Sequence, residues 1–98
     1  MEPADRNEHP LPELFTPRQW AVLTKRLDLS PRQAEIARLI CLGYRNNEVP
    51  ALLRLHDATI RVHRRVLYRK LGIRDRVGVP VKLILAHRGL RPGRWKNN

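Results

Sequence analysis

Two nearly identical helix-start signals, Thr16-Pro17-Arg18-Gln19 and Ser30-Pro31-Arg32-Gln33, lie fourteen residues apart in this 98-residue chain. In each signal the hydroxyl residue can cap free backbone amides, the proline suits the first helical position, and the glutamine can complete a capping box. Apolar residues recur at intervals of three and four behind both signals, which is typical of a buried helix face. The sequence therefore predicts an all-α fold, and the chain length predicts one domain.

A third, shorter helix is predicted from Asn46, as its cap, to about residue 55. Pro50 then occupies the fourth helical position, where its missing amide is expected to distort the first turn. A break at Leu55-His56-Asp57 separates this helix from a longer one over residues 58–71. Two helices joined by so short a break predict a helix-turn-helix, whose second helix enters the major groove of DNA.

The helix predicted over residues 58–71 has two chemically different faces. One face is apolar apart from a histidine and consists of Ile60, His63, Leu67 and Leu71. The opposite face is basic apart from a valine and consists of Arg61, Val62, Arg65 and Arg69. Solvated helices ordinarily mix charge signs, yet no acidic residue lies between Ala58 and Ile73. The pattern predicts one face in the core and one face that meets a polyanion.

The last predicted helix follows Gly72, which ends the helix before it. Its start is less sharply marked, because Asp75 can act as a cap while Pro80 suits a first helical turn. Gly78 lies between these two residues. The sequence leaves both starts open.

The net charge of +11 lies entirely in the C-terminal part of the chain. Residues 58–98 contain twelve lysines and arginines and a single acidic residue, Asp75, whereas residues 1–57 contain eight basic and eight acidic residues. Such a concentration indicates a polyanionic partner, of which nucleic acid is the commonest. Membrane phosphates, acidic proteins and RNA fit the same charge, and so does a solvated basic face with no partner.

Many positions between Leu29 and Ile73 fit one known pattern without a gap. They are Leu29, Pro31, Arg32, Glu35, Leu39, Gly43, Asn46, Glu48, Leu53, Thr59, Val62, His63 and the run Tyr68-Arg69-Lys70-Leu71-Gly72. With these residues, about half the chain resembles the LuxR/FixJ-type DNA-binding domain of bacterial transcription regulators. The resemblance implies a small four-helix helix-turn-helix domain, to which this chain adds an N-terminal helix, and a last helix that often forms a dimer contact.

The resemblance also implies roles for individual residues. Three side chains match positions that reach base edges: Arg61, Val62 and Arg65. An arginine can bond guanine O6 and N7 together, whereas a valine offers only apolar contact to a thymine methyl. Five residues are expected to contact the DNA backbone: Asn46, Asn47, Thr59, Arg69 and Lys70. Asn46 and Asn47 are placed at a helix N-terminus, where free amides favour a phosphate.

Catalytic and metal-binding patterns are not found in the sequence. The histidines His9, His56, His63 and His87 lack HExxH spacing, and the single cysteine, Cys41, has no second thiol to pair with. Cys41 is predicted to be a small buried hydrophobe, and His63 a structural histidine. No apolar run approaches the roughly 20 residues that span a bilayer. The sequence predicts no enzyme, no cofactor, no metal and no membrane partner.

The predicted organisation is an acidic mobile arm over residues 1–14, an additional helix over 15–28, a DNA-binding domain over 29–90 and a basic tail over 91–98. Because residues 1–28 are too few for a receiver or ligand-binding domain, we expect a stand-alone, sequence-specific regulator of transcription. Its expected partner is double-stranded DNA, and its expected location is the cytoplasm, at the nucleoid.

Two other functions remain open at this point. The same helices fit a non-specific or architectural nucleic-acid binder, in which charge alone drives binding. They also fit a protein-interaction adaptor that contacts RNA polymerase or another regulator. Self-association is expected either through the last helix, at about residues 80–88, or through the apolar face formed by Trp20, Leu23 and Leu27.

Overall fold

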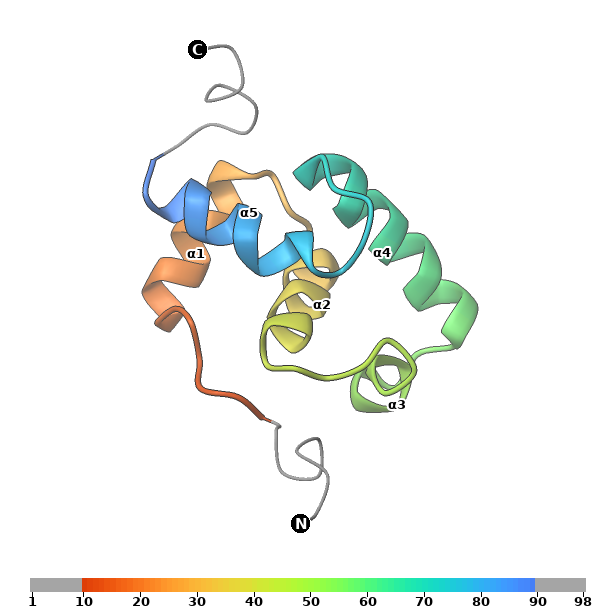
Figure 1. Ribbon diagram of the computed structural model, residues 1–98. Helices are drawn as coiled ribbons and strands as arrows, with labels where there is room; N and C mark the ends of the chain where they lie inside the picture. The colour runs from red at the N-terminus through yellow and green to blue at the C-terminus, as the bar shows by residue number, and fades with distance from the viewer. Residues whose placement is uncertain (1–9, 90–98) are drawn as a thin grey trace.

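The computed structural model describes residues 10–89, and this part of the chain is helical, with no strand (Figure 1). Its helices are α1 (Pro17–Arg26), α2 (Pro31–Cys41), α3 (Val49–Leu53), α4 (Asp57–Leu71) and α5 (Gly78–His87). Helix α2 lies at the centre and packs against α1, α4 and α5, while α3 packs against α4. The predicted all-α fold, with an N-terminal helix added to a four-helix unit, is confirmed.

Both helix-start signals form the bonds that the sequence predicts. In α1, the Gln19 amide donates to Thr16 Oγ1 at 3.1 Å, and the Thr16 amide donates to Gln19 Oε1 at 2.8 Å. Ser30 and Gln33 make the same reciprocal pair at the start of α2, at 3.1 and 2.9 Å. Because each box satisfies two otherwise free donors, the starts of α1 and α2 are fixed by local chemistry.

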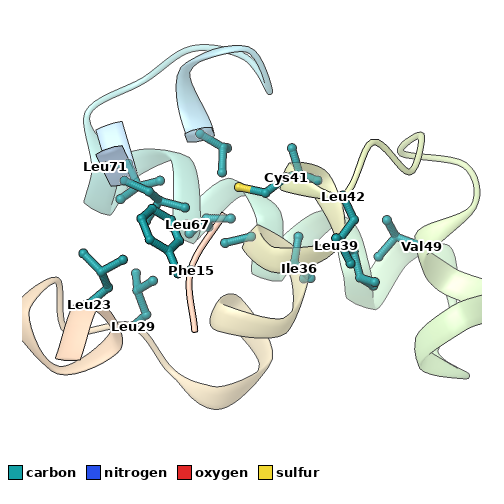
Figure 2. Packing of buried hydrophobic residues seen from close by; sticks show 14 of the residues in the cluster. Phe15, Leu23, Leu29, Ile36, Leu39, Cys41, Leu42, Val49, Leu67 and Leu71 are labelled. Carbon is teal, nitrogen blue, oxygen red and sulfur yellow. The ribbon is translucent and has the colours of Figure 1, made fainter. Parts of the chain in front are cut away.

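The core is built from one face of every helix. Its largest fully buried side chains are Leu23, Ile36, Val49, Ile60, Leu67, Leu71, Val79 and Leu83. Figure 2 shows Leu23 and Leu29 at one end of this cluster and Val49 at the other. Trp20 and Leu27 are half-buried against the same core, and the Trp20 ring meets Phe15 edge to face at 5.2 Å. Helix α1 is therefore part of the domain.

Helix α3 begins at Val49, two residues later than predicted, and its N-cap is Glu48 rather than Asn46. Pro50 is consequently the second helical residue instead of the fourth. An amide at this position has no acceptor within the helix, so its absence costs nothing there. The predicted distortion by Pro50 was wrong, because the helix starts where the proline fits.

The turn between α3 and α4 also differs from the predicted one. It consists of Arg54, Leu55 and His56, because α3 ends at Leu53 and Asp57 is already the first residue of α4. Arg54 adopts the left-handed conformation, with φ of 57°. His56 is the N-cap of α4 but makes no capping hydrogen bond with its side chain. The predicted break of residues 55–57 was therefore placed one residue too late.

Helix α5 starts at Gly78, between the two predicted starts. Asp75 is not its N-cap, although Asp75 Oδ1 accepts a bond from the Val77 amide at 3.1 Å. A Cβ at position 78 would lie 2.7 Å from Ile73 Cγ2, well inside van der Waals contact. Close packing on Ile73 therefore requires glycine at the start of α5.

Gly78→Ala should lower the free energy of unfolding by about 1–2 kcal/mol, because the new methyl group forces Ile73 or the start of α5 to move. The better helix propensity of alanine offsets only part of this loss. Urea unfolding monitored by circular dichroism measures the change. Val77→Ala, at the exposed neighbouring position, serves as control and should stay within about 0.5 kcal/mol. Equal stability of the Gly78→Ala variant and the unsubstituted protein would contradict the clash.

Residues 10–14 belong to the segment predicted to be a mobile arm, and two of them are bonded to α2 and its C-terminal end. The Leu11 amide donates to the Leu42 carbonyl oxygen at 2.8 Å, and Arg38 Nε donates to Glu13 Oε2 at 2.9 Å. These contacts hold the start of the described chain beside the domain. The rest of the predicted arm, residues 1–9, and the predicted tail, residues 91–98, lie outside the described residues.

Cys41 is buried at the end of α2, as predicted. Burial, together with the charge of Glu13 and against that of Arg76, raises the pKa of its thiol from 9.0 to about 12. The thiol is therefore protonated and unreactive in the native protein at neutral pH.

Labelling of Cys41 by a thiol-reactive disulfide at pH 8 should be slow in buffer and should accelerate with urea in step with unfolding. The same burial makes the free energy of unfolding depend on pH. Because the unfolded thiol ionises near its usual pKa, the contribution of Cys41 to stability is complete below pH 9 and is lost between pH 9 and about 12. The rate of reagent release measures the accessibility of the thiol. Complete labelling of the native protein within seconds would contradict the observed burial.

Candidate nucleic-acid interface

Helices α3 and α4 and the three-residue turn between them form one packed unit. The Leu55 amide donates to the Pro50 carbonyl oxygen, and the Ile60 amide donates to the His56 carbonyl oxygen, both at 3.0 Å. Val49 is buried, while Leu53 is half-buried against the same core. The bonds and the apolar contacts together fix the position of α4 on the domain.

The two faces predicted for α4 are present in the structure. Ile60, Leu67 and Leu71 are buried in the core, and His63 is half-buried on the same side. The outward residues Arg61, Val62, Arg65 and Arg69 are all exposed. The face prediction for this helix is confirmed.

Helix α4 lies at the edge of the domain, on the opposite side of α2 from α1 (Figure 1). With 15 residues it is about 22 Å long. The major groove of B-DNA is about 12 Å wide and admits a helix of this diameter. The exposed basic face of α4, at the edge of the domain, can therefore enter the groove without interference from α1.

The outward arginines differ in what they bind within the protein. Arg61 forms an ion pair with Asp57, one turn earlier in α4. The side chains of Arg65 and Arg69 make no hydrogen bond or ion pair to any residue between 10 and 89. Their guanidinium donors are therefore available to an external acceptor.

Two of the residues predicted to contact the DNA backbone already bind within the domain. Lys70 Nζ donates to the Asp28 carbonyl oxygen at 2.5 Å and to Gln33 Oε1 at 3.0 Å. Asn46 Oδ1 accepts a bond from Arg76 Nη1 at 3.2 Å. These bonds connect the end of α4 to the start of α2, and the segment before α3 to the segment after α4.

Asn46 and Asn47 were predicted at the start of the third helix. Because α3 begins at Val49, they lie instead in the turn before it. A helix of five residues also has a weak dipole. The predicted place of Asn46 and Asn47 at the start of this helix was therefore wrong, while their contact with a phosphate stays a prediction. Asn47 and Thr59 nevertheless have exposed positions, on either side of the turn between α3 and α4.

Sequence reasoning missed two arginines that organise the domain. Arg76 donates through Nη2 to the Tyr44 carbonyl oxygen as well as binding Asn46. Arg26 Nη1 donates to the Ala86 carbonyl oxygen at 2.7 Å, which ties α1 to the end of α5. Bonds from a cationic side chain to a carbonyl thirty or sixty residues away leave no periodic or spacing signal in the sequence.

Residues 10–89 contain neither a metal-binding cluster nor a membrane-spanning helix. No group of three or more His, Cys, Asp or Glu side chains between residues 10 and 89 could hold a metal ion. In the same range, no helix has the length and hydropathy needed to cross a membrane. Burial raises the pKa of the Tyr68 hydroxyl on α4, an effect that the charge of Arg64 opposes.

The packed α3–turn–α4 unit, with an exposed basic face on α4, defines a helix-turn-helix domain of the DNA-binding kind. The family model for "Bacterial regulatory proteins, luxR family" matches residues 27–82, more than half of the chain. The chain therefore belongs to this family of DNA-binding regulators, which is not a family of enzymes. The predicted resemblance is confirmed.

Two curated relatives come from Escherichia coli K12. The nitrate/nitrite response regulator protein NarP is 33% identical over 61 residues, which are 62% of this chain and 28% of NarP. The HTH-type protein YhjB is 28% identical over 75 residues, which are 71% of this chain and 38% of YhjB. The chain thus spans about a third of the length of the curated relatives it matches. No solved structure matches it.

Proposed function

We propose that this protein binds duplex DNA sequence-specifically as a transcription regulator, with α4 in the major groove. Arg61, Val62 and Arg65 contact base edges in this proposal. The observation that supports it best is the outward face of α4, where Val62 is 55% exposed among arginines. Charge alone does not require an apolar side chain at this place, whereas contact with a thymine methyl does.

The proposed contacts to the DNA backbone come from residues around these three. Thr59, Asn47 and Arg69 are exposed and can reach phosphates directly. Lys70 keeps one unused donor, because its ammonium has three N–H groups and two of them bond within the domain. The Asn46 oxygen is bonded to Arg76, so a phosphate contact by Asn46 uses an amide N–H group. Phosphate contacts of this kind orient a protein on DNA without distinguishing sequences.

Selection of binding sites from a random pool of duplex DNA tests the proposal, at about 150 mM salt to weaken purely electrostatic binding. An enriched motif of defined sequence is the expected result. Binding to bulk DNA without enrichment would instead favour the architectural alternative, in which α4 contacts only the backbone. Failure to retain any DNA would favour the adaptor.

We propose that self-association, where it occurs, uses α5. The Trp20–Leu23–Leu27 face packs against the core, with Leu23 buried and Trp20 and Leu27 half-buried, so less of it is left for a second copy or another protein. At the start of α5, by contrast, Val77 and Val81 are exposed one turn apart. A two-fold symmetric motif in the selected sites, together with a dimer in sedimentation analysis, is the expected result for the α5 interface. A dimer that survives Val81→Asp would exclude this interface.

A further inference from the structure

Asp57 is the first residue of α4 and the only acidic residue in the helix. Its side chain is 61% exposed and forms an ion pair with Arg61, which is 59% exposed. The bond runs from Arg61 Nη2 to Asp57 Oδ2 and joins residues four positions apart. A carboxylate therefore lies at the N-terminal end of the helix that is otherwise basic on its outward face.

Asp57 stabilises the start of α4, because a carboxylate in the first turn of a helix complements the helix dipole. This effect does not depend on the pair with Arg61. Exposed ion pairs between neighbouring turns of a helix add little to folding stability. A negative charge beside the phosphate backbone opposes binding, because every phosphate repels it. The pair itself has a separate consequence, which concerns the orientation of the Arg61 guanidinium.

We propose that Asp57 is a positioning residue that holds the Arg61 guanidinium in the orientation for base recognition and so determines sequence discrimination. This inference rests on the proposed function, in which Arg61 contacts a base edge. The pair engages Nη2, and the guanidinium retains its donors on Nη1 and Nε. The N-terminal part of a recognition helix is also the part that reaches base edges.

The ion pair favours bases over phosphates for two physical reasons. An arginine side chain has many rotamers, and ordering it before binding lowers the entropy lost when it bonds a guanine. If Arg61 instead turns towards a phosphate, it leaves Asp57 as an unpaired negative charge beside the DNA backbone. Binding to non-cognate DNA is therefore weakened. The pair lowers the total affinity for DNA and improves the discrimination between sequences.

The test compares Asp57→Asn, Asp57→Glu and Arg61→Ala on three duplexes: the selected site, the site changed at the base pair that Arg61→Ala identifies, and unrelated DNA. Asp57→Asn should reduce discrimination at that base pair about two- to fivefold and tighten binding to unrelated DNA. Asp57→Glu retains the charge and should preserve discrimination. In the Arg61→Ala background, Asp57→Asn should leave discrimination unchanged.

Glu35→Gln is the matched control, because it removes one negative charge from another exposed ion pair, Arg32–Glu35 of α2. It should leave base discrimination unaltered. Unchanged discrimination by Asp57→Asn, with a motif for the unsubstituted protein, would overturn the positioning role and leave the proposed function intact. A changed preference at a different base pair would also overturn that role, since Asp57 would then contact that base itself. Absence of any motif for the unsubstituted protein would overturn both.

Discussion

Leu67→Ala is expected to lower the free energy of unfolding by about 2–5 kcal/mol, the largest loss among the substitutions considered. Leu67 is completely buried in the C-terminal half of α4, a helix that packs against α2. Truncation leaves a cavity that the surrounding side chains fill only in part. Because a domain of this size is typically stable by about 5–15 kcal/mol, the Leu67→Ala variant should unfold at a markedly lower temperature than the unsubstituted protein.

Urea unfolding followed by circular dichroism measures the effect of Leu67→Ala. Val62→Ala, on the exposed face of the same helix, is the matched control and should change stability by less than about 0.5 kcal/mol. The pair of variants separates the two faces of α4, because one removes core packing and the other removes only exposed surface. Equal losses for both variants would contradict the observed orientation of the helix.

Arg65→Ala is expected to weaken binding to the selected site by about 1–3 kcal/mol, or roughly five- to more than a hundredfold, and to relax the preference at one base pair. The reason is that the Arg65 guanidinium is exposed and binds no residue between 10 and 89. All its donors can therefore serve a base. Fluorescence anisotropy on the selected duplex and on its single-base variants measures both effects.

Two controls distinguish base recognition from simple charge. Arg69→Ala, one turn further along α4, should weaken binding to all sequences alike, because a phosphate contact has no sequence preference. Lys25→Ala removes the same charge from the exposed side of α1 and should weaken DNA binding much less. If Arg65→Ala also weakens binding equally for every sequence, Arg65 contacts the backbone and its assignment to a base edge is wrong.

The sequence predicted the elements whose causes are local. The capping boxes at Thr16 and Ser30 determine where α1 and α2 begin, since each uses bonds within four residues. The faces of α4 follow from its apolar periodicity, which reflects burial directly. The start of α3 was missed because the cap rule favoured Asn46, whereas the fit of Pro50 in the first turn moved the start to Val49.

The candidate site could be predicted only in its outward-facing part. Exposure of Arg61, Val62 and Arg65 follows from the helical period, and their contacts with bases remain predictions. The bonds of Lys70 to the Asp28 carbonyl, and of Arg76 to the Tyr44 carbonyl, depend on how distant segments meet. Such contacts are determined by packing in three dimensions, so no pattern along the chain indicates them.

The use of cations inside the domain has a consequence for counterion release. Each lysine or arginine that neutralises a phosphate displaces about 0.9 condensed cations from B-DNA. Arg26, Lys70 and Arg76 direct charge to carbonyl oxygens of their own chain, so they contribute less to this displacement than a free side chain. In the proposed complex, the number of ions released therefore depends on how many basic side chains face phosphates, and it should be smaller than the net charge of +11 suggests. Binding is thereby less sensitive to ionic strength than the charge alone suggests.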